Sequence, residues 1–266
     1  MPSLKFSANL SFMFQETSNL LERYALAKEA GFKGVEVAFP YCNTVEEVVQ
    51  AKKACNAEQV LINGYVDVPK GELGYAALTS PEDEAKFQSS VQKAVTYAKA
   101  LDCKLIHVMS GAVASPTPAN DAAYDRNITW ATRLFEKEGI IGVIEPINRR
   151  SVPNYYLSDY PRAVNLIKSI GSPNLKLMLD VFHLQQLHGN LTSNVSSLLK
   201  EGLVGHIQIA QVPDRGEPDS EGEVNYKYLL KLLEKEKYNG WIGLEYKPVD
   251  GTSKGLKWIK NLGYEL

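Results

Sequence analysis

Cysteine is scarce in this chain of 266 residues, and its cysteines do not pair by spacing. Cys42, Cys55 and Cys103 are odd in number, lie far apart and form no CxxC motif. Such a set is typical of reduced thiols in a cytosol-like compartment rather than of a disulfide framework. We therefore expect a cytoplasmic protein.

Long apolar runs and an excess of charge are absent as well. No segment approaches 18 uninterrupted apolar residues, and the first seven residues lack a basic stretch followed by an apolar core. Neither a membrane span nor a signal peptide is therefore expected. The formal net charge is −2 and the pI is near 6.1. Nucleic acids and anionic membranes favour a basic surface, so neither is expected as a partner.

The chain also lacks linker-like or low-complexity segments that would divide it into domains. Apolar stretches that predict strands instead alternate eight times with segments of helical periodicity. A (β/α)8 barrel takes about 250 residues, so we expect an α/β fold in which residues 1–266 form a single TIM-barrel domain. The predicted strands are 4–9, 34–39, 59–63, 104–109, 140–145, 175–180, 204–210 and 241–245, and the predicted helices are 16–30, 44–55, 80–101, 121–138, 158–170, 192–201, 226–237 and 252–261.

A doubly wound open sheet is the alternative fold for alternating strands and helices. It would normally carry a glycine-rich phosphate-binding loop after the first strand. The residues that follow Asn9 are Leu-Ser-Phe-Met-Phe, which contain no glycine. The barrel is therefore the favoured prediction.

The functional interpretation starts from residues 175–183, Leu-Lys-Leu-Met-Leu-Asp-Val-Phe-His. The apolar part of this stretch is typical of a parallel strand that is buried on both faces. Asp180 stands where that strand ends, in a position to bind a metal ion or to orient a substrate. The structural alternative is that Asp180 caps the following helix, as aspartate often does.

Three other predicted strands end in polar residues at regular intervals. Glu145 closes one strand before Pro146, Gln208 lies near the end of another, and Glu245 ends the last. The intervals from Glu145 through Asp180 and Gln208 to Glu245 are 35, 28 and 37 residues, and each fits one strand, one helix and two loops. Right-handed parallel connections bring such strand ends to one side of the sheet, so we expect the four side chains to converge.

Three carboxylates in one pocket repel each other unless a cation neutralises them. All-oxygen ligation suits Mg²⁺ or Mn²⁺ better than Zn²⁺, so the predicted cofactor is one of these divalent metal ions. Beside such an ion, one carboxylate can remove a proton next to a carbonyl and another group can return it. Return to the adjacent carbon is isomerisation and return to the other face of the same carbon is epimerisation, and the local pattern fits both.

Taken together, these residues resemble the xylose-isomerase-like barrel superfamily and, within it, the hydroxypyruvate isomerase family. The similarity runs over essentially the whole chain. Any one matching block is weak alone, but several blocks in the right order make a strong match. The blocks are 6–11 (Phe-Ser-Ala-Asn-Leu-Ser), 31–36 (Gly-Phe-Lys-Gly-Val-Glu), 144–150 (Ile-Glu-Pro-Ile-Asn-Arg-Arg) with Pro153 and 155–157, 179–183, and 206–210 with Arg215 and 222–226 (Gly-Glu-Val-Asn-Tyr).

The resemblance implies the reversible conversion of hydroxypyruvate to 2-hydroxy-3-oxopropanoate (tartronate semialdehyde) without an organic cofactor. It implies that Glu145 and Glu245 are the metal-binding acid–base pair and that Asp180 is a further metal ligand. Gln208 stands where the sugar epimerases of the superfamily have a histidine ligand. This difference points toward the isomerase and leaves a weaker donor, Gln208, as the fourth metal ligand.

The implied substrate is a small hydroxy-keto acid, and the resemblance makes His183 a partner of one of its oxygens. A histidine satisfied beneath a helix is the structural alternative. We assign the substrate carboxylate to Arg215, because a guanidinium group binds a carboxylate in a bidentate fork. Arg150 is the alternative clamp, and a solvated loop arginine is the structural alternative for Arg215.

Glu36 and His107 end two predicted strands and are candidates for lining the substrate cleft. A structural hydrogen-bonding role fits each of them equally well. Asn148 and Glu223 are loop candidates of lower rank.

Three competing functions remain. A ketose 3-epimerase is weakened by Gln208 and by the arginines, since a neutral sugar needs no carboxylate clamp. A binding barrel without catalysis is disfavoured because three acids in one pocket are costly without a metal. AP endonucleases of the superfamily hold a multi-zinc cluster that needs many histidines, and this chain has four. Homo-oligomerisation, frequent among barrels of this size, stays open because no interface patch is visible in the sequence.

Overall fold

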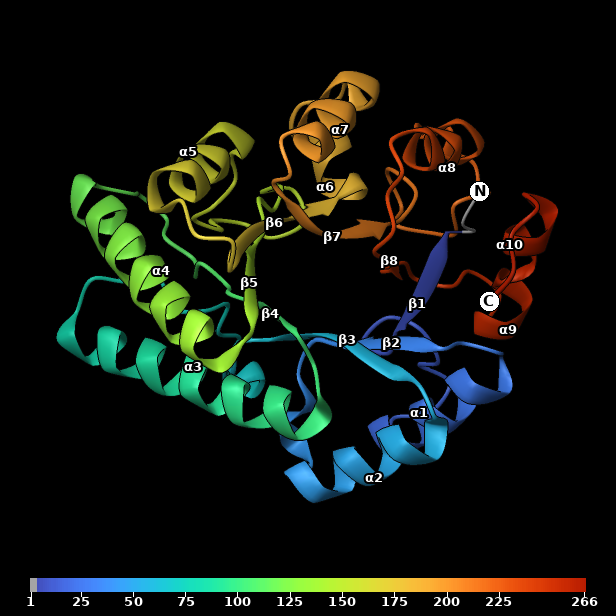
Figure 1. The fold of residues 1–266 in the computed structure, drawn as a ribbon, viewed down its shortest axis with the longest axis horizontal. Helices are drawn as coiled ribbons and strands as arrows, with labels where there is room; N and C mark the ends of the chain where they lie inside the picture. The colour runs from blue at the N-terminus through green and yellow to red at the C-terminus, as the bar shows by residue number, and fades with distance from the viewer. Residues whose placement is uncertain (1–3) are drawn as a thin grey trace.

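A computed structural model describes residues 4–266 of the protein, and residues 1–3 of the predicted domain lie outside the described part. Eight parallel strands close into a barrel in chain order, with β8 paired to β1 (Figure 1). This closure confirms the predicted (β/α)8 barrel and rules out the open sheet. The strands are β1 (Lys5–Asn9), β2 (Gly34–Val37), β3 (Glu58–Asn63), β4 (Leu105–His107), β5 (Ile141–Ile144), β6 (Leu175–Asp180), β7 (Val204–Ile209) and β8 (Trp241–Leu244).

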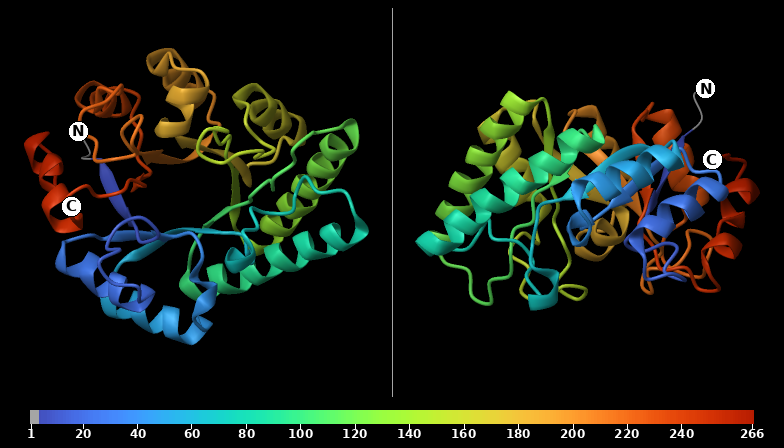
Figure 2. Two further views of the ribbon diagram at one scale, coloured as in Figure 1. Left: turned by 180° about the vertical axis from the view of Figure 1, so that it is seen from behind. Right: turned by 90° about the horizontal axis from the view of Figure 1, so that it is seen from below.

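The helices form an outer ring around the strands, which is visible in the view from behind (Figure 2, left). Each predicted helix overlaps an observed one. The α-helices are α1 (Leu20–Glu29), α2 (Val45–Cys55), α3 (Pro81–Leu101), α4 (Pro118–Glu138), α5 (Tyr160–Ile170), α6 (Val181–Leu187), α7 (Leu191–Lys200), α8 (Tyr226–Lys235), α9 (Thr252–Gly255) and α10 (Lys257–Asn261), and short 3-10 turns occur at η1 (Pro40–Cys42) and η2 (Val68–Lys70).

Local sequence explains where several of these helices begin. Helix α2 opens with a capping box, in which the Thr44 hydroxyl accepts from the Glu47 amide and the Glu47 carboxylate accepts from the Thr44 amide. Helix α3 opens in the same way with Ser80 and Asp83, with Pro81 at its first position. These caps satisfy backbone groups that would otherwise lack partners in the first turn.

Helix α6 is the one that the sequence analysis missed. It starts directly after β6, and Asp180 is its N-cap residue, with Oδ1 accepting from the Phe182 amide at 2.8 Å. The segment is only seven residues long, which is too short for helical periodicity to stand out from a buried apolar run. The structural alternative for Asp180, a helix cap, is therefore confirmed.

Three predicted helices differ from the structure by a boundary shift of at least three residues or by a break. Helix α1 begins four residues later than predicted, after the Asn19 cap, and α4 begins three residues earlier, at Pro118. The last predicted helix is broken into α9 and α10 around Leu256. A Cβ on Gly255 would lie 2.3 Å from Glu217 Oε1, so this glycine allows the β7–α8 loop to pack against the helix end.

The main core lies between the strands and the surrounding helices. One example is Phe6 of β1, whose ring contacts Trp258 at 5.4 Å and Tyr264 at 5.7 Å between centroids and so joins the C-terminal segment to the first strand. A smaller separate apolar cluster is formed by Val60 and Leu61 of β3, Val143 of β5 and Met178 of β6. Among residues 4–266, no helix combines the length and apolarity needed to cross a membrane.

The positions of the three cysteines give a first testable prediction. Cys42 is exposed, whereas Cys55 and Cys103 are buried, and burial raises the pKa of the Cys103 thiol to about 12. Because the thiolate is the reactive form, we expect a thiol reagent to modify one cysteine in the native protein and three after unfolding. A Cys42→Ser variant serves as the control and should show no rapid native reaction. Rapid modification of a second native thiol would contradict the burial described here.

Candidate active site

The carboxyl ends of the strands hold the residues that the sequence predicted to converge. Glu145 follows β5 directly, Asp180 is the last residue of β6, and Glu245 follows β8 directly. Asp180 pairs in register with Gln208 of β7, and Gln208 pairs in turn with Gly243 of β8. The barrel therefore places all four positions at one end of neighbouring strands.

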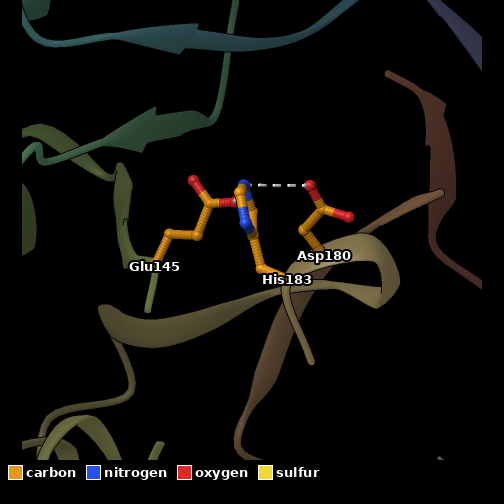
Figure 3. Close-up of side chains that lie close together, drawn as sticks. All are labelled: Glu145, Asp180 and His183. Atoms are coloured by element: carbon orange, nitrogen blue, oxygen red, sulfur yellow. Dashed lines mark ion pairs between the residues drawn. The ribbon is translucent and has the colours of Figure 1, made fainter. Parts of the chain in front are cut away.

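Glu145, Asp180 and His183 form a compact buried group (Figure 3). Their exposed fractions are 4%, 0% and 2%, and one potential ligand atom of each lies within 4.8 Å of the others. His183 Nε2 is 3.7 Å from Glu145 Oε1 and 3.6 Å from Asp180 Oδ2. Among the residues that the structure describes, no other cluster of three histidine, cysteine or acidic side chains is this close.

Arg215 lies inside the acidic site rather than in solvent. Its Nη2 atom is 2.5 Å from Glu245 Oε2 and 3.2 Å from Asp180 Oδ2, and its Nε donates to the Glu245 carbonyl. The guanidinium group stacks between the rings of Phe12 and Phe182, at 4.8 and 4.7 Å from their centroids. Arg215 thus links two of the predicted acids and partly neutralises them, whereas Arg150 is exposed on the β5–α5 loop.

The β7–α8 loop presents Arg215 with a backbone φ of +60°. The conformation of this loop is held by Gln211, a buried residue that the sequence analysis did not single out. The Gln211 Oε1 atom accepts from the amides of Val212 and Val224, and its Nε2 atom donates to three loop carbonyls. The Arg215 amide in turn donates to the Gln211 carbonyl at 2.8 Å. These bonds hold the loop, and with it Arg215, over the strand ends.

Burial dominates the electrostatics of the two glutamates. It raises the pKa of Glu145 well above its usual range, and the charges of Glu245 and Asp180 raise it further. The pKa of Glu245 rises to about 8, mainly through burial, although the neighbouring Arg215 opposes the rise. Glu145 Oε1 has no hydrogen-bond partner among residues 4–266. The site therefore holds more negative charge than Arg215 alone can compensate, which favours binding of a further cation.

His107 approaches the same site from β4. Its Nε2 atom is buried 3.7 Å from Glu145 Oε2 and has no hydrogen-bond partner among the described residues. Burial, with a smaller contribution from His183, lowers the pKa of His107 to about 3. The ring is therefore neutral at physiological pH and lies next to Glu145.

Glu36 lies within a polar network inside the barrel. Its carboxylate accepts from Ser7 at 2.6 Å, from His206 and Gln208 at 2.8 Å each, and from Asn9 at 3.4 Å. A Cβ on Gly243 would lie 2.1 Å from Glu36 Oε1, so the glycine of β8 makes room for the carboxylate. These contacts correspond to the structural hydrogen-bonding role that was one of the two roles considered for Glu36 from the sequence.

The same network positions two residues near the acids. The Asn9 Nδ2 atom lies 3.4 Å from both Glu36 Oε2 and Glu245 Oε1, so Asn9 bridges the network and the site. Sequence analysis missed Asn9, although its place at the end of the first strand was a usable signal. With Gln208 Nε2 bound to Glu36, its Oε1 atom is buried without a partner among the described residues. That oxygen remains available as a ligand.

Comparison with known proteins shows which family this chain resembles. The family model described as Xylose isomerase-like TIM barrel matches residues 24–262. The hydroxypyruvate isomerase of Escherichia coli (strain K12) is 39% identical over 96% of this chain and 98% of its own length, and the 2-oxo-tetronate isomerase of Cupriavidus necator is 39% identical over 96% and 97%.

A solved structure agrees with these sequence matches. The Brucella melitensis protein described as AP endonuclease, family 2, superposes with a TM-score of 0.91 and 41% identity, covering 98% of this chain and 99% of that one. The resemblance inferred from the sequence is thereby confirmed. The chain belongs to the xylose isomerase-like TIM barrel family, in the group that contains the hydroxypyruvate isomerases.

Proposed function

We propose that the protein is an isomerase that interconverts hydroxypyruvate and 2-hydroxy-3-oxopropanoate. The observation that carries the proposal is one buried site in which Glu145 and Glu245 lie with Arg215, which suits proton transfer on a small carboxylate substrate. The relatives named hydroxypyruvate isomerase and 2-oxo-tetronate isomerase support the reaction class. A four-carbon 2-oxo acid is therefore the second substrate to test.

In this proposal Glu145 and Glu245 are the acid–base pair. One carboxylate removes a proton from the hydroxymethyl carbon C3, the electrons pass into an enediolate over C2 and C3, and a proton returns to C2. The hydroxyl proton on O3 leaves as the aldehyde forms, and O2 gains a proton, so atoms and charge balance. Burial raises the pKa of both glutamates, that of Glu245 to about 8, which fits groups that take up and release protons during turnover.

Arg215 is the proposed clamp for the substrate carboxylate. Its rigid fork lies against Phe12 and Phe182, so little side-chain freedom is lost when it binds. Arg150, the alternative clamp, is exposed on its loop. His183 and His107 are proposed to contact substrate oxygens beside Glu145. Glu36 contributes indirectly, through its hydrogen bonds to Asn9 and Gln208.

A divalent metal ion, Mg²⁺ or Mn²⁺, is the proposed cofactor. The residues fit such an ion, because the unpartnered Glu145 Oε1 and Gln208 Oε1 atoms are buried oxygen donors and Asp180 and Glu245 add carboxylates. When bound, the ion would polarise substrate oxygens and stabilise the negative charge of the enediolate. Glu145, Asp180, Gln208 and Glu245 would hold it, and the negative charge of the three carboxylates favours a cation at this place.

Removal of metal tests this proposal. We expect chelator-treated protein to lose hydroxypyruvate isomerisation by at least about 10²-fold and to regain it with Mn²⁺ or Mg²⁺. Equal activity with and without metal would support the proposed substrate and contradict the proposed metal cofactor. Calorimetry on the same sample measures binding directly, and absence of both binding and turnover would favour a barrel without catalysis.

Two other functions can be tested with the same preparation. Turnover of free ketoses in preference to hydroxypyruvate would indicate a ketose 3-epimerase, the alternative left by the sequence. The description of the Brucella melitensis structure makes abasic DNA a further candidate ligand. Only one group of three candidate metal ligands occurs among the described residues, and His183 is its one histidine, so a multi-zinc cluster is not expected. Failure to bind abasic duplex DNA at low salt would exclude this function.

A further inference from the structure

The two ring nitrogens of His183 have different surroundings. Its Nε2 atom faces Glu145 and Asp180 in the acidic site. Its Nδ1 atom points the other way, toward the β5–α5 loop, where it lies 2.6 Å from Asn148 Nδ2 and 3.3 Å from the Asn148 backbone nitrogen. Asn148 therefore contacts the nitrogen that is remote from the site.

Both groups that Asn148 offers to Nδ1 are hydrogen-bond donors. The backbone N–H of Asn148 can only donate. The orientation of the side-chain amide is set by Ser151, whose backbone N–H donates to Asn148 Oδ1 at 2.8 Å. This leaves the Asn148 Nδ2 group, with its hydrogens, facing the ring. Nδ1 must accept, so in a neutral ring the proton is on Nε2.

The ring is neutral in this environment. Because Nδ1 faces the backbone and side-chain N–H donors of Asn148, it carries no proton, and a ring protonated on Nε2 alone is uncharged. A neutral imidazole with its proton on Nε2 has no lone pair to offer from that atom. Metal-binding histidines usually donate their other N–H to a carboxylate or carbonyl acceptor, but Nδ1 of His183 meets donors instead.

We propose that Asn148 is a positioning residue that fixes His183 as the Nε2–H tautomer, which makes His183 a hydrogen-bond donor to a substrate oxygen and removes it from the set of metal ligands. This inference rests on the proposed isomerase function and refines it. A neutral N–H directed at the carbonyl oxygen of a 2-oxo acid would stabilise the negative charge that develops there. The divalent metal ion would then be bound by the oxygen atoms of the site alone, without a histidine nitrogen.

Nitrogen NMR of ¹⁵N-histidine-labelled protein tests the tautomer without substrate. A His183→Gln variant identifies the signals of His183 among those of the four histidines. We expect wild-type His183 to show a protonated Nε2 and an unprotonated Nδ1, both before and after addition of Mg²⁺. A protonated Nδ1 in the wild type, or loss of the Nε2 proton when Mg²⁺ binds, would overturn the proposal.

Two substitutions of Asn148 separate its backbone from its side chain. Asn148→Asp replaces the donor at 2.6 Å by an acceptor, so we expect Nδ1 to become protonated. Asn148→Ala keeps the backbone N–H, so the Nε2–H tautomer should persist. If Asn148→Asp left Nδ1 unprotonated, Asn148 would not set the tautomer.

Asn127→Asp is the matched control, because Asn127 is a buried asparagine of α4 whose Nδ2 donates to the Ala76 carbonyl. This control should change stability without changing the His183 signals. For hydroxypyruvate turnover, we expect kcat to fall about tenfold in Asn148→Ala and at least about 10²-fold in Asn148→Asp, with a smaller change in KM. Equal loss of kcat in Asn127→Asp would show that the effect is only structural.

The NMR and kinetic measurements distinguish an error in the proposed function from an error in the role of Asn148. If the wild type turns over no 2-oxo acid, the proposed function is wrong, but the tautomer measurement still decides the role of Asn148. If the wild type is active and the tautomer does not respond to Asn148→Asp, the function stands and this inference is wrong.

Discussion

Replacing Glu145 by glutamine is expected to lower kcat for hydroxypyruvate isomerisation by about 10²- to 10⁴-fold, the range that a positioned acid–base group contributes. Glutamine keeps the size of the side chain but cannot take or give a proton. The fold should survive, because Glu145 Oε1 has no hydrogen-bond partner among residues 4–266 and the change removes a buried charge. Thermal unfolding should therefore show equal or higher stability.

A second expected effect of Glu145→Gln concerns the metal. Loss of one carboxylate ligand should weaken Mn²⁺ binding, which calorimetry measures independently of turnover. Assays at saturating Mn²⁺ then separate the lost proton transfer from the lost metal. Glu245→Gln should have a similar kinetic effect, since the two residues share the proposed acid–base role.

Glu58→Gln is the matched control for these variants. Glu58 begins β3, at the opposite end of the barrel from the strand ends that carry the site, and it is exposed. We expect its kcat, KM and Mn²⁺ affinity to remain within about twofold of the wild type. Near-normal turnover in Glu145→Gln would remove Glu145 from the mechanism, even if the metal site were correct.

The barrel itself was predictable because its signals are local and repeated. Eight apolar strands, each followed by a helix with its own start and stop residues, leave few alternatives for a chain of this length. The strand-end positions of Glu145, Asp180 and Glu245 followed from that topology. Register alone then places Gln208 beside Asp180.

The direction of a side chain at a strand end was less predictable. Glu36 lies one residue before the carboxyl end of β2 and Glu245 directly follows β8, yet the Glu36 carboxylate is hydrogen-bonded to Ser7, His206 and Gln208 inside the barrel. Its position depends on Gly243, which lies more than 200 residues away in the chain. No local pattern in the sequence around Glu36 contains that information.

Asp180 shows why a structural and a functional interpretation need not compete. One of its oxygens caps α6 through Phe182, and the other lies 3.2 Å from Arg215 and 3.6 Å from His183. The cap fixes the carboxylate and so orients its second oxygen in the site. Sequence analysis treated the two roles as alternatives because it had not found the short helix α6.

Replacing Arg215 by methionine should change the binding of anions and cations in opposite directions. Methionine can still pack between Phe12 and Phe182 but has no charge. We expect KM for hydroxypyruvate to rise by about two orders of magnitude, since loss of one partner of a buried, hydrogen-bonded charge pair costs about 2–5 kcal/mol. The inhibition constant of pyruvate, which shares the carboxylate, should rise in parallel.

Mn²⁺ should bind about tenfold more tightly to Arg215→Met than to the wild type. In the structure the guanidinium group lies 2.5 Å from Glu245 and 3.2 Å from Asp180, two of the proposed ligands, so the arginine and the ion compete for the same oxygens. Removing the arginine leaves those carboxylates without a positive partner. Calorimetric titration of chelator-treated protein measures the difference.

Arg150→Met is the control, because Arg150 carries the same charge on an exposed loop beside the site. The KM for hydroxypyruvate and the Mn²⁺ affinity of Arg150→Met should remain within about twofold of the wild type. A large rise in KM in this variant would mean that Arg150, and not Arg215, binds the substrate carboxylate. Tighter Mn²⁺ binding in Arg215→Met without a change in KM would mean that Arg215 balances the charge of the acids but does not bind the substrate. Weaker Mn²⁺ binding in Arg215→Met would mean that Arg215 holds the carboxylates in place for the ion. The inference that the guanidinium group and Mn²⁺ compete for these oxygens would then be wrong.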